Sequence, residues 1–335
     1  MATTTHDDVR GIHDARERER GREARKPSEI PARGWLDIAV RVKNEVAKDN
    51  VSLIAAGLAL YALLAIFPAL GAAVSIYGLF ASPQDIAHHM NAFSGVLPTE
   101  ATQILQKQLQ TLTQQEGALN VGLIAGVAIA LWSARKGMVA LMTTMNVAYD
   151  EQERRGFFKQ IFVSMLFTVG AILGFLIVML LIVAVPIAVH FLPLGPFASV
   201  VILVLRWILL WFLAAFGMAV IYRYAPDRKH AQWRWLSWGS GIAASLWLLG
   251  SAAFSLYARH STSYGETYGA LGGVVVMLMW FLLTGFTVIL GAEINSEMER
   301  QTRRDTTENP DKPMGSRGAY AADTVGPSKE EVKDR

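Results

Sequence analysis

The chain lacks cysteine altogether and has few charged residues for its length. The absence of cysteine excludes disulfide bonds, thiolate catalysis and cysteine-ligated metal sites. Charged residues make up 18% of the 335 positions, against about 25% in ordinary soluble domains. The sequence also lacks the phosphate-binding loop GxxxxGKS or GxxxxGKT, the zinc motif HExxH and the nucleophile elbow GxSxG. We therefore predict that the protein is not an enzyme and holds no cofactor or metal ion.

Charge is missing above all from five long windows that contain no Asp, Glu, Lys or Arg. These windows are 51–84, 117–134, 160–205, 235–258 and 267–292. An α-helix needs about 20 residues to cross the apolar core of a bilayer, and the third window is long enough for more than one crossing. The pattern predicts an all-α polytopic membrane protein with six transmembrane helices, at about 51–80, 118–134, 160–189, 197–221, 236–258 and 268–292.

The remaining segments are polar. Residues 1–34 carry interleaved Arg and Glu, and residues 299–335 are polar with Pro and Gly, so both are predicted to be disordered tails that cannot bury a core. Between them, residues 35–298 are predicted to form the membrane domain. Within it, residues 35–48 have the pattern of an amphipathic helix, and 81–117 that of an external helical loop. The first tail has no apolar stretch like that of a signal peptide, so the first span is expected to act as its own insertion signal.

The distribution of Lys and Arg predicts how the spans are oriented. Six spans put both termini on the same side of the membrane, and 28 of the 31 basic residues then fall on that side. The opposite loops hold Lys107 and Arg259, and Arg206 lies within a span. The positive-inside rule therefore places both termini in the cytoplasm.

Arg206 is the charged residue predicted to lie deepest in the membrane. It follows the outer start of its span by about nine residues, or roughly 13 Å of helix. An unpaired arginine at such depth costs at least about 2.5–3.5 kcal/mol. In one interpretation Arg206 contacts an anion or a lipid headgroup in an internal cavity. In the other, backbone carbonyls at a helix break satisfy it, or it snorkels to the interface; the sequence favours neither.

A second group of polar residues is predicted near the cytoplasmic ends of the spans. With Arg206, they are the candidate substrate contacts of the chain: Asp49, Arg135, Glu293 and Asn295, with Arg223 as a further member of the group. In one interpretation they form a polar mouth. In the other they anchor and cap the helices in the ordinary way.

Four sets of motifs resemble the YihY/BrkB family of bacterial inner-membrane proteins, also called the virulence factor BrkB family. They are DNVSLIAAGLA from Asp49 with the following FP, LWSA with MNVAY and RGF, YRYAP with Trp233, and YGALG with Trp280 and GAEIN. The match covers residues 35–300. It departs from the family at Ile294, where leucine is usual.

The resemblance implies a multi-pass protein of the bacterial inner membrane that contributes to envelope integrity and, in some members, to serum resistance or virulence. Family members have also carried the label ribonuclease BN. RNA hydrolysis needs placed metals or acid–base groups and a basic groove with aromatic stacking, and none is readable here.

Three classes of function remain open: a transporter or flippase for an anionic lipid or solute, a non-transporting scaffold for envelope maintenance, and an enzyme such as a ribonuclease. We expect membrane lipids and envelope proteins as partners and no nucleic acid. The sequence does not indicate an oligomeric state.

Overall fold

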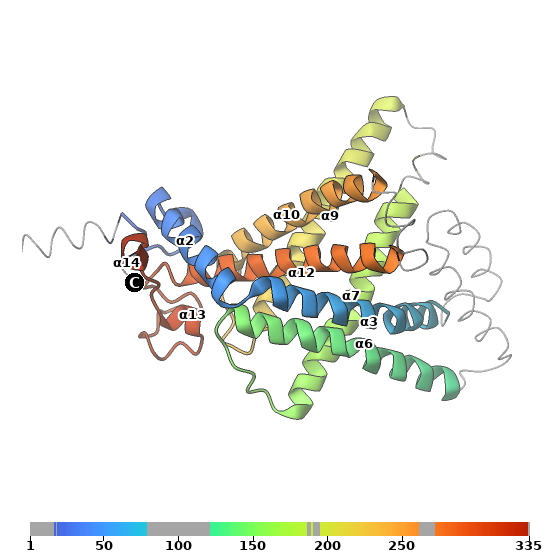
Figure 1. Cartoon of the computed structure of the whole chain (residues 1–335), viewed down its shortest axis with the longest axis horizontal. Coiled ribbons are helices and arrows are strands. Elements are labelled where there is room, and N and C mark those ends of the chain that lie inside the picture. The colour runs from blue at the N-terminus through green and yellow to red at the C-terminus, as the bar shows by residue number, and fades with distance from the viewer. Residues whose placement is uncertain are drawn as a thin grey trace, which may run out of the picture. The chain divides into compact units, whose positions relative to one another are not determined.

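The computed structural model describes residues 17, 19–78, 121–185, 189, 195–260 and 272–333. Within these residues every regular element is a helix and there are no strands (Figure 1). The long helices are α2 (Ala32–Lys48), α3 (Val51–Gly78), α6 (Val121–Ala148), α7 (Phe157–Met179), α9 (Pro196–Tyr224), α10 (Trp233–His260) and α12 (Gly272–Glu299). The short ones are η1 (Pro27–Glu29), η2 (Leu180–Ala184), α13 (Tyr320–Asp323) and α14 (Lys329–Lys333).

Five helices are long and apolar enough to cross a membrane. The qualifying stretches are Val51–Ala69, Phe157–Ile182, Phe197–Tyr224, Trp233–Ala258 and Gly272–Glu299. Large apolar side chains on them are widely exposed, as with Phe158 of α7 (84%) and Phe197 of α9 (83%). Water would penalise such surfaces, whereas lipid tails are as apolar as the side chains themselves. The prediction of an all-helical membrane protein is therefore confirmed.

The predicted number of six spans stays a prediction. Among the described residues α6, which runs to Ala148 and carries Arg135 and Lys136, is not one of the qualifying helices. The starts of two predicted spans, 118–120 and 268–271, lie outside the described residues. So do the predicted external loop 81–117 and residues 186–188 of the third span.

The chain divides into two compact units. Unit 1 comprises residues 1–59, 141–155 and 207–335, and unit 2 comprises 60–140 and 156–206. In unit 1, α12 packs against α10 and α2, and α14 packs against α2. In unit 2, Ile172 of α7 is buried among Ala69, Ala130 and Leu131.

The crossing of α10 and α12 in unit 1 depends on two glycines. A Cβ atom at Gly239 would lie 2.6 Å from the carbonyl oxygen of Gly291, and one at Gly291 would lie 2.6 Å from Cβ of Ala243 in α10. Neither distance leaves room for a side chain, so the two backbones approach closely. The Tyr222 hydroxyl also donates a 2.9 Å hydrogen bond to the carbonyl of Val288. This close crossing fixes the end of α12 that carries Asn295.

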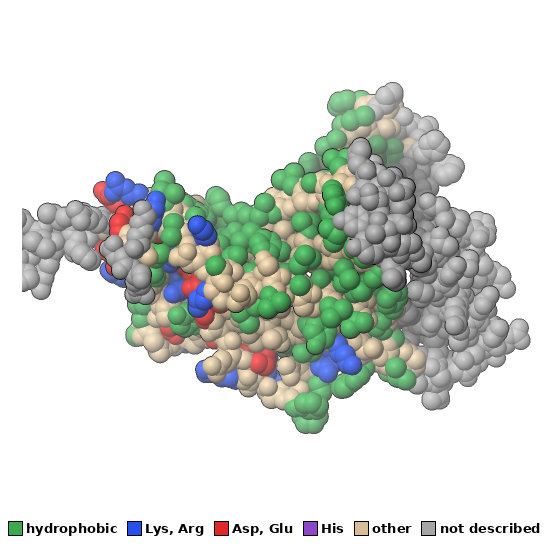
Figure 2. All heavy atoms as spheres, viewed as in Figure 1, with side chains coloured by type: hydrophobic (Ala, Val, Ile, Leu, Met, Phe, Trp, Pro, Cys, Tyr) green, Lys and Arg blue, Asp and Glu red, His purple; other side chains and the backbone are tan. Residues whose placement is uncertain are grey.

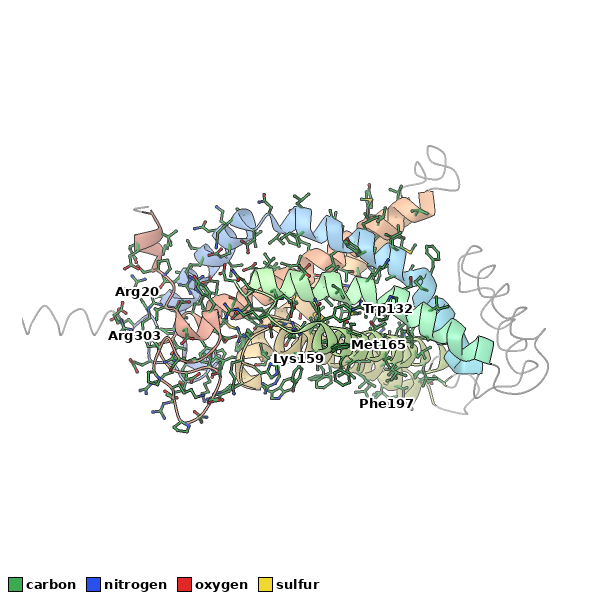
Figure 3. All side chains as sticks on the ribbon, turned by 90° about the horizontal axis from the view of Figure 1, so that it is seen from below. Arg20, Trp132, Lys159, Met165, Phe197 and Arg303 are labelled. Carbon is green, nitrogen blue, oxygen red and sulfur yellow. The ribbon has the colours of Figure 1, made fainter. Side chains whose placement is uncertain are left out.

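The terminal segments of unit 1 fold together, which differs from the predicted disorder. The backbone N–H of Arg303 donates to the carbonyl of Arg22 over 2.8 Å, and the Arg22 guanidinium donates to the carbonyl of Gly326 over 2.8 Å. Figure 3 labels Arg20 and Arg303 at this meeting point. Charged side chains gather around α2 and α14, while hydrophobic ones follow the long helices (Figure 2).

Buried arginines are the physical reason for this difference. Arg317 donates to the carbonyls of Lys312 and Ala322, at 2.9 and 2.6 Å, and Arg41 forms a buried ion pair with Glu297. A composition argument counts apolar side chains and takes a polar segment to be unable to bury a core. Here guanidinium groups satisfy carbonyls and carboxylates instead. The predicted disorder is corrected for residues 19–34 and 299–333, while residues 1–16 lie outside the described part.

Candidate functional site

Three of the predicted site residues lie together in unit 1. Asp49 follows α2 directly, and Glu293 and Asn295 lie near the carboxyl end of α12. Asp49 lies close enough to Glu293, and Tyr149 close enough to Glu293 and Asn295, for their side chains to interact electrostatically. We call Asp49, Tyr149, Glu293 and Asn295 the polar cluster.

Two tight corners of the backbone position Asp49 and Tyr149. Asn50 has a φ of 51° and Asp150 a φ of 52°, a left-handed conformation that Asn and Asp tolerate better than most residues. The first corner lets α3 begin at once after α2, and the second lies directly after the end of α6. The ammonium group of Lys48 lies 3.6 Å from a carboxylate oxygen of Asp150 and so links the two corners.

Most of the polar cluster is buried, and three of its polar atoms lack a hydrogen-bond partner within the described chain. Glu293 is 2% exposed, and Tyr149 and Asn295 are fully buried. The atoms without a partner are Oε1 of Glu293, the hydroxyl oxygen of Tyr149 and Nδ2 of Asn295. Buried polar atoms are normally paired, and leaving one unpaired costs about 1–3 kcal/mol. Three of them in one place indicate a site with a role beyond packing.

The other polar atom of Asn295 has a clear structural task. Its Oδ1 accepts a 3.0 Å hydrogen bond from the backbone N–H of Gly239. This bond fixes the amide across the α10–α12 crossing. Asn295 therefore combines a helix-packing contact with an unpaired donor.

A buried ion pair borders the polar cluster beside Tyr149. Arg228 donates to both carboxylate oxygens of Glu299, at 2.8 and 2.7 Å, and its guanidinium lies 4.5 Å from the centre of the Tyr149 ring. Thr306 donates a 2.8 Å hydrogen bond to the same carboxylate. Because Glu299 neutralises Arg228, this arginine does not balance the carboxyl groups of the cluster.

The environment of Asp49 favours its protonated form. Asp49 is half-buried. Burial raises the pKa of Asp49, the neighbouring Lys48 acts in the opposite direction, and the carboxylates of Glu45 and Asp150 raise it further. Burial likewise raises the pKa of Tyr149, so this hydroxyl keeps its proton.

Arg206 belongs to unit 2 and contacts backbone there. Its guanidinium donates a 3.1 Å hydrogen bond to the carbonyl of Ile182. Ile182 lies within η2, a π-helical turn that continues α7. Such turns interrupt the regular hydrogen-bond ladder of an α-helix and are frequent at functional sites. This hydrogen bond is the contact expected if a backbone carbonyl at a helix break satisfies the arginine.

The other two predicted arginines have separate surroundings. In unit 2, Arg135 donates a 3.1 Å hydrogen bond to the hydroxyl of Ser164, and its guanidinium lies 4.6 Å from the centre of the Trp132 ring. In unit 1, the guanidinium of Arg223 lies 4.9 Å from the Trp233 ring and donates to the carbonyl of Ala231. The described contacts therefore do not join the predicted polar mouth into one group.

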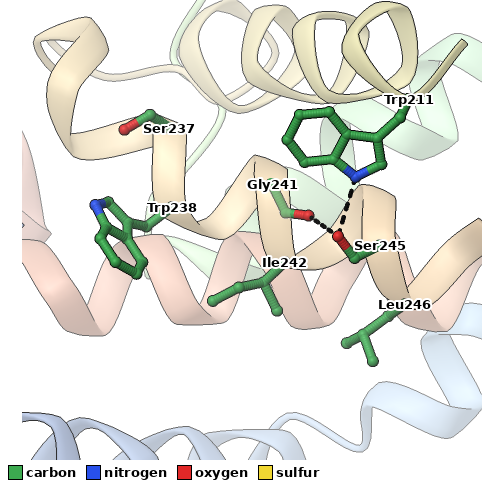
Figure 4. Close-up of a pocket in the computed structure, with 7 residues that line it drawn as sticks. All are labelled: Trp211, Ser237, Trp238, Gly241, Ile242, Ser245 and Leu246. Carbon is green, nitrogen blue, oxygen red and sulfur yellow. Dashed lines mark hydrogen bonds between the residues drawn. The ribbon is translucent and has the colours of Figure 1, made fainter. Parts of the chain in front are cut away.

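A hollow of about 500 Å³ lies on α9 and α10 in unit 1 (Figure 4). The indole N–H of Trp211 donates to the hydroxyl of Ser245, which donates to the carbonyl of Gly241, at 3.0 and 2.9 Å. The hydroxyl of Ser237 donates to the carbonyl of Arg234. Each of these polar groups already has a hydrogen-bond partner within the protein. The hollow therefore offers a mainly apolar wall rather than a polar binding site.

Tyr149 is the cluster residue that the sequence reasoning did not single out as a site residue. It is the last residue of the MNVAY segment, and its position before a left-handed Asp150 gives it no distinctive spacing relative to Asp49 or Glu293. Its occurrence in a family motif was the available signal.

Comparison with known proteins assigns the chain to a family. The family model described as "Virulence factor BrkB" matches residues 42–315, a range that includes the whole polar cluster. The chain belongs to this family. The resemblance seen in the sequence motifs is thus confirmed.

Several curated relatives support the assignment to the BrkB family. The chain is 30% identical over 261 residues to the "Putative ribonuclease-like protein YfkH" of Bacillus subtilis (strain 168), covering 76% of this chain and 92% of the relative. It is 26% identical over 289 residues to a UPF0761 membrane protein of Vibrio vulnificus (strain YJ016), covering 83% and 88% respectively. A UPF0761 membrane protein of Idiomarina loihiensis is 26% identical over 216 residues, covering 62% and 70%. No solved structure matches the chain.

Proposed function

We propose that this BrkB-family protein lies in the bacterial inner membrane and supports envelope integrity by moving an anionic lipid or solute across it. The observation that carries the proposal is the polar cluster, where Tyr149, Glu293 and Asn295 are buried with unpaired polar atoms. A scaffold gains nothing from such costly groups, whereas a protein that binds and releases a ligand or an ion uses them.

Arg206 supplies the positive charge that an anionic substrate needs within the span. It lies nine residues after the start of the apolar stretch Phe197–Tyr224. A guanidinium carries several N–H donors in a planar fork, so it can hold a carbonyl and a phosphate or carboxylate at the same time. The bond to Ile182 would then orient Arg206 rather than compete with the substrate.

A second candidate function is a non-transporting scaffold for envelope maintenance. The hydrogen bond from Arg206 to the Ile182 carbonyl favours it, because a carbonyl at a helix break then satisfies part of the guanidinium. The folded terminal segments also offer a polar surface for envelope proteins. In this case Arg206 serves stability only.

Reconstitution into liposomes separates the two functions. We expect the purified protein to accelerate the scrambling of an anionic lipid or the flux of an anionic solute above the rate in protein-free liposomes. Arg206→Leu should abolish this activity while the protein stays folded, because the apolar side chain removes a desolvation cost. Arg206→Lys should be partly defective, since it lacks the bidentate guanidinium.

The matched control is Arg234→Leu, which removes an exposed arginine at the start of α10. It should retain full activity. Thermal melting in detergent and complementation of an envelope-stress phenotype accompany each variant. An Arg206→Leu protein that melts earlier, together with a wild type that moves no lipid or solute, would favour the scaffold.

A further inference from the structure

We infer that the exposed side of α2 rests on the cytoplasmic leaflet of the membrane and binds the anionic headgroups of its phospholipids. This side comprises Arg33, Leu36, Ala39, Lys43 and Ala47, all of them exposed, and we call it the outer face of α2. The inference goes beyond the proposed function, because it describes how unit 1 meets the bilayer surface and requires no transport.

The opposite side of α2 belongs to the core of unit 1. Ile38 and Val42 are buried in a cluster that includes Trp235 of α10. Arg41 is 3% exposed and forms an ion pair with Glu297 of α12, and α14 also packs against α2. These contacts fix the rotation of α2 about its axis, so the outer face points away from the core.

The outer face combines apolar and basic side chains at helical spacing. Positions 36, 39, 43 and 47 are three or four residues apart, so they lie on one side of the helix. Leu36 is 55% exposed, and Figure 2 shows hydrophobic and basic side chains next to one another over α2. In a membrane interface, the apolar side chains of such a helix enter the headgroup region while its basic groups stay at the surface.

The neighbours of α2 place it where two spans enter the membrane. At its carboxyl end, the apolar stretch Val51–Ala69 of α3 begins after only two intervening residues. Near its amino end, the ring of Trp35 lies 5.5 Å from the ring of Trp238, early in the apolar stretch Trp233–Ala258 of α10. Trp238 is 47% exposed, and tryptophan is enriched at membrane–water interfaces. α2 therefore lies at the level of the lipid headgroups.

Lys43 gives the outer face a positive charge that has no acidic partner within the described residues. No ion pair of this part of the chain includes Lys43, whereas Lys48 on the same helix pairs with Glu45 over 2.6 Å. Arg33 pairs with the exposed Glu19, a contact that solvent and salt weaken. The cytoplasmic leaflet carries the negative charge of anionic lipids, and both termini are predicted to lie on that side. Its headgroups therefore complement the charge of the outer face.

A protein surface is the other occupant to consider for an exposed helix face. The spans that adjoin α2 hold it at the membrane surface, where lipid headgroups surround it. A second copy of the chain or a soluble protein would have to displace these headgroups and offer Lys43 an acidic partner. Lipid requires no such exchange and supplies the phosphate that complements Lys43, so we assign the outer face to lipid.

Spin labels test the inference on the full-length protein in liposomes. Because the chain has no cysteine, Leu36→Cys, Ala39→Cys and Ser316→Cys each give a single labelling position. In liposomes of phosphatidylcholine and phosphatidylglycerol, we expect the labels at 36 and 39 to be more accessible to oxygen, which concentrates in lipid, than to a water-soluble nickel complex. The label at the exposed position 316 should show the opposite preference.

A charge reversal separates headgroup recognition from simple apolar contact. Lys43→Glu, combined with the label at Ala39→Cys, should lower the preference for oxygen in liposomes that contain phosphatidylglycerol and leave it unchanged in pure phosphatidylcholine. The matched control is Lys312→Glu, which makes the same charge change at an exposed lysine of the terminal segment. It should leave the preference for oxygen unchanged in both kinds of liposome. Thermal melting in detergent checks that both variants are folded.

Three results would overturn the lipid site. The first is a pair of labels at 36 and 39 that are as accessible to the nickel complex as the label at 316. The second is a preference for oxygen at position 39 that Lys43→Glu leaves unchanged in the presence of phosphatidylglycerol. The third is magnetic broadening between labels at 36 or 39 that disappears on dilution with unlabelled protein, since it would identify a contact between two copies instead. Because no transport is measured, none of these results bears on the proposed function.

Discussion

Single glycines set the backbone approach on which the site of this protein depends. A Cβ atom at Gly291 of α12 would lie 2.6 Å from Cβ of Ala243 in α10, whereas one at Gly170 would meet nothing within 4 Å. We predict that Gly291→Ala lowers the free energy of unfolding by about 1–3 kcal/mol through overpacking. Gly170→Ala, the matched control, should be neutral or slightly stabilising because alanine favours helix. Thermal melting of both variants in detergent checks this, and equal melting temperatures would contradict the close crossing.

The raised pKa of Asp49 predicts how stability depends on pH. A carboxyl group whose pKa is higher in the folded state than its ordinary value of 3.8 binds its proton more tightly when folded. Its stabilising contribution is complete below pH 3.8 and is lost as the pH rises through the folded-state pKa. We predict that Asp49→Asn makes the free energy of unfolding less dependent on pH in this range. Asp311→Asn should leave the pH dependence unchanged. Chemical unfolding over a pH series measures it, and parallel profiles for Asp49→Asn and wild type would refute it.

The sequence was informative about site residues only where a residue was chemically conspicuous. Asp49, Glu293 and Asn295 could be predicted because polar residues beside an apolar run are expensive. Their proximity could not, since it depends on the close α10–α12 crossing and on two left-handed residues. Arg206 was conspicuous too, but one of its partners is a backbone carbonyl, which has no sequence signature.

At the scale of elements, α12 combines an apolar span with a charged end. Its last turns carry Glu293, Glu297 and Glu299, and the last two pair with arginines that come from other elements. Charge-free windows predicted where the long helices lie, but α6 continues to Ala148 and α12 to Glu299, beyond the predicted span ends at 134 and 292. The fold of residues 299–333 was not predicted, because buried polar side chains such as Arg300 and Arg317 help to hold it, beside a few buried alanines.

The Arg228–Glu299 pair tests this description of the charged end of α12. Both side chains are buried, so removing one leaves an uncompensated charge. We predict that Arg228→Met lowers the free energy of unfolding by about 3–5 kcal/mol, and that the double variant Arg228→Met, Glu299→Leu regains much of the loss. A double-mutant cycle by thermal melting measures the coupling. Additive single effects would mean that the pair does not stabilise this segment.

At the scale of the whole molecule, orientation in the membrane is the prediction that rests on sequence alone. The basic residues predict cytoplasmic termini and an external 81–117 loop. Because the chain has no cysteine, single cysteines can be introduced without background. We predict that a membrane-impermeant thiol reagent labels Gln108→Cys from outside the cell and Ser316→Cys only after the membrane is opened. Labelling of both from the same side would contradict the six-span topology.

Transport of an anionic lipid or solute is the central claim for this BrkB-family protein. The most direct measurement is scrambling or flux in proteoliposomes, for wild type and Arg206→Leu at equal protein content. We predict transport above that of protein-free liposomes in wild type, and a folded Arg206→Leu protein that has lost it. Wild-type rates equal to those of protein-free liposomes would contradict the proposed function.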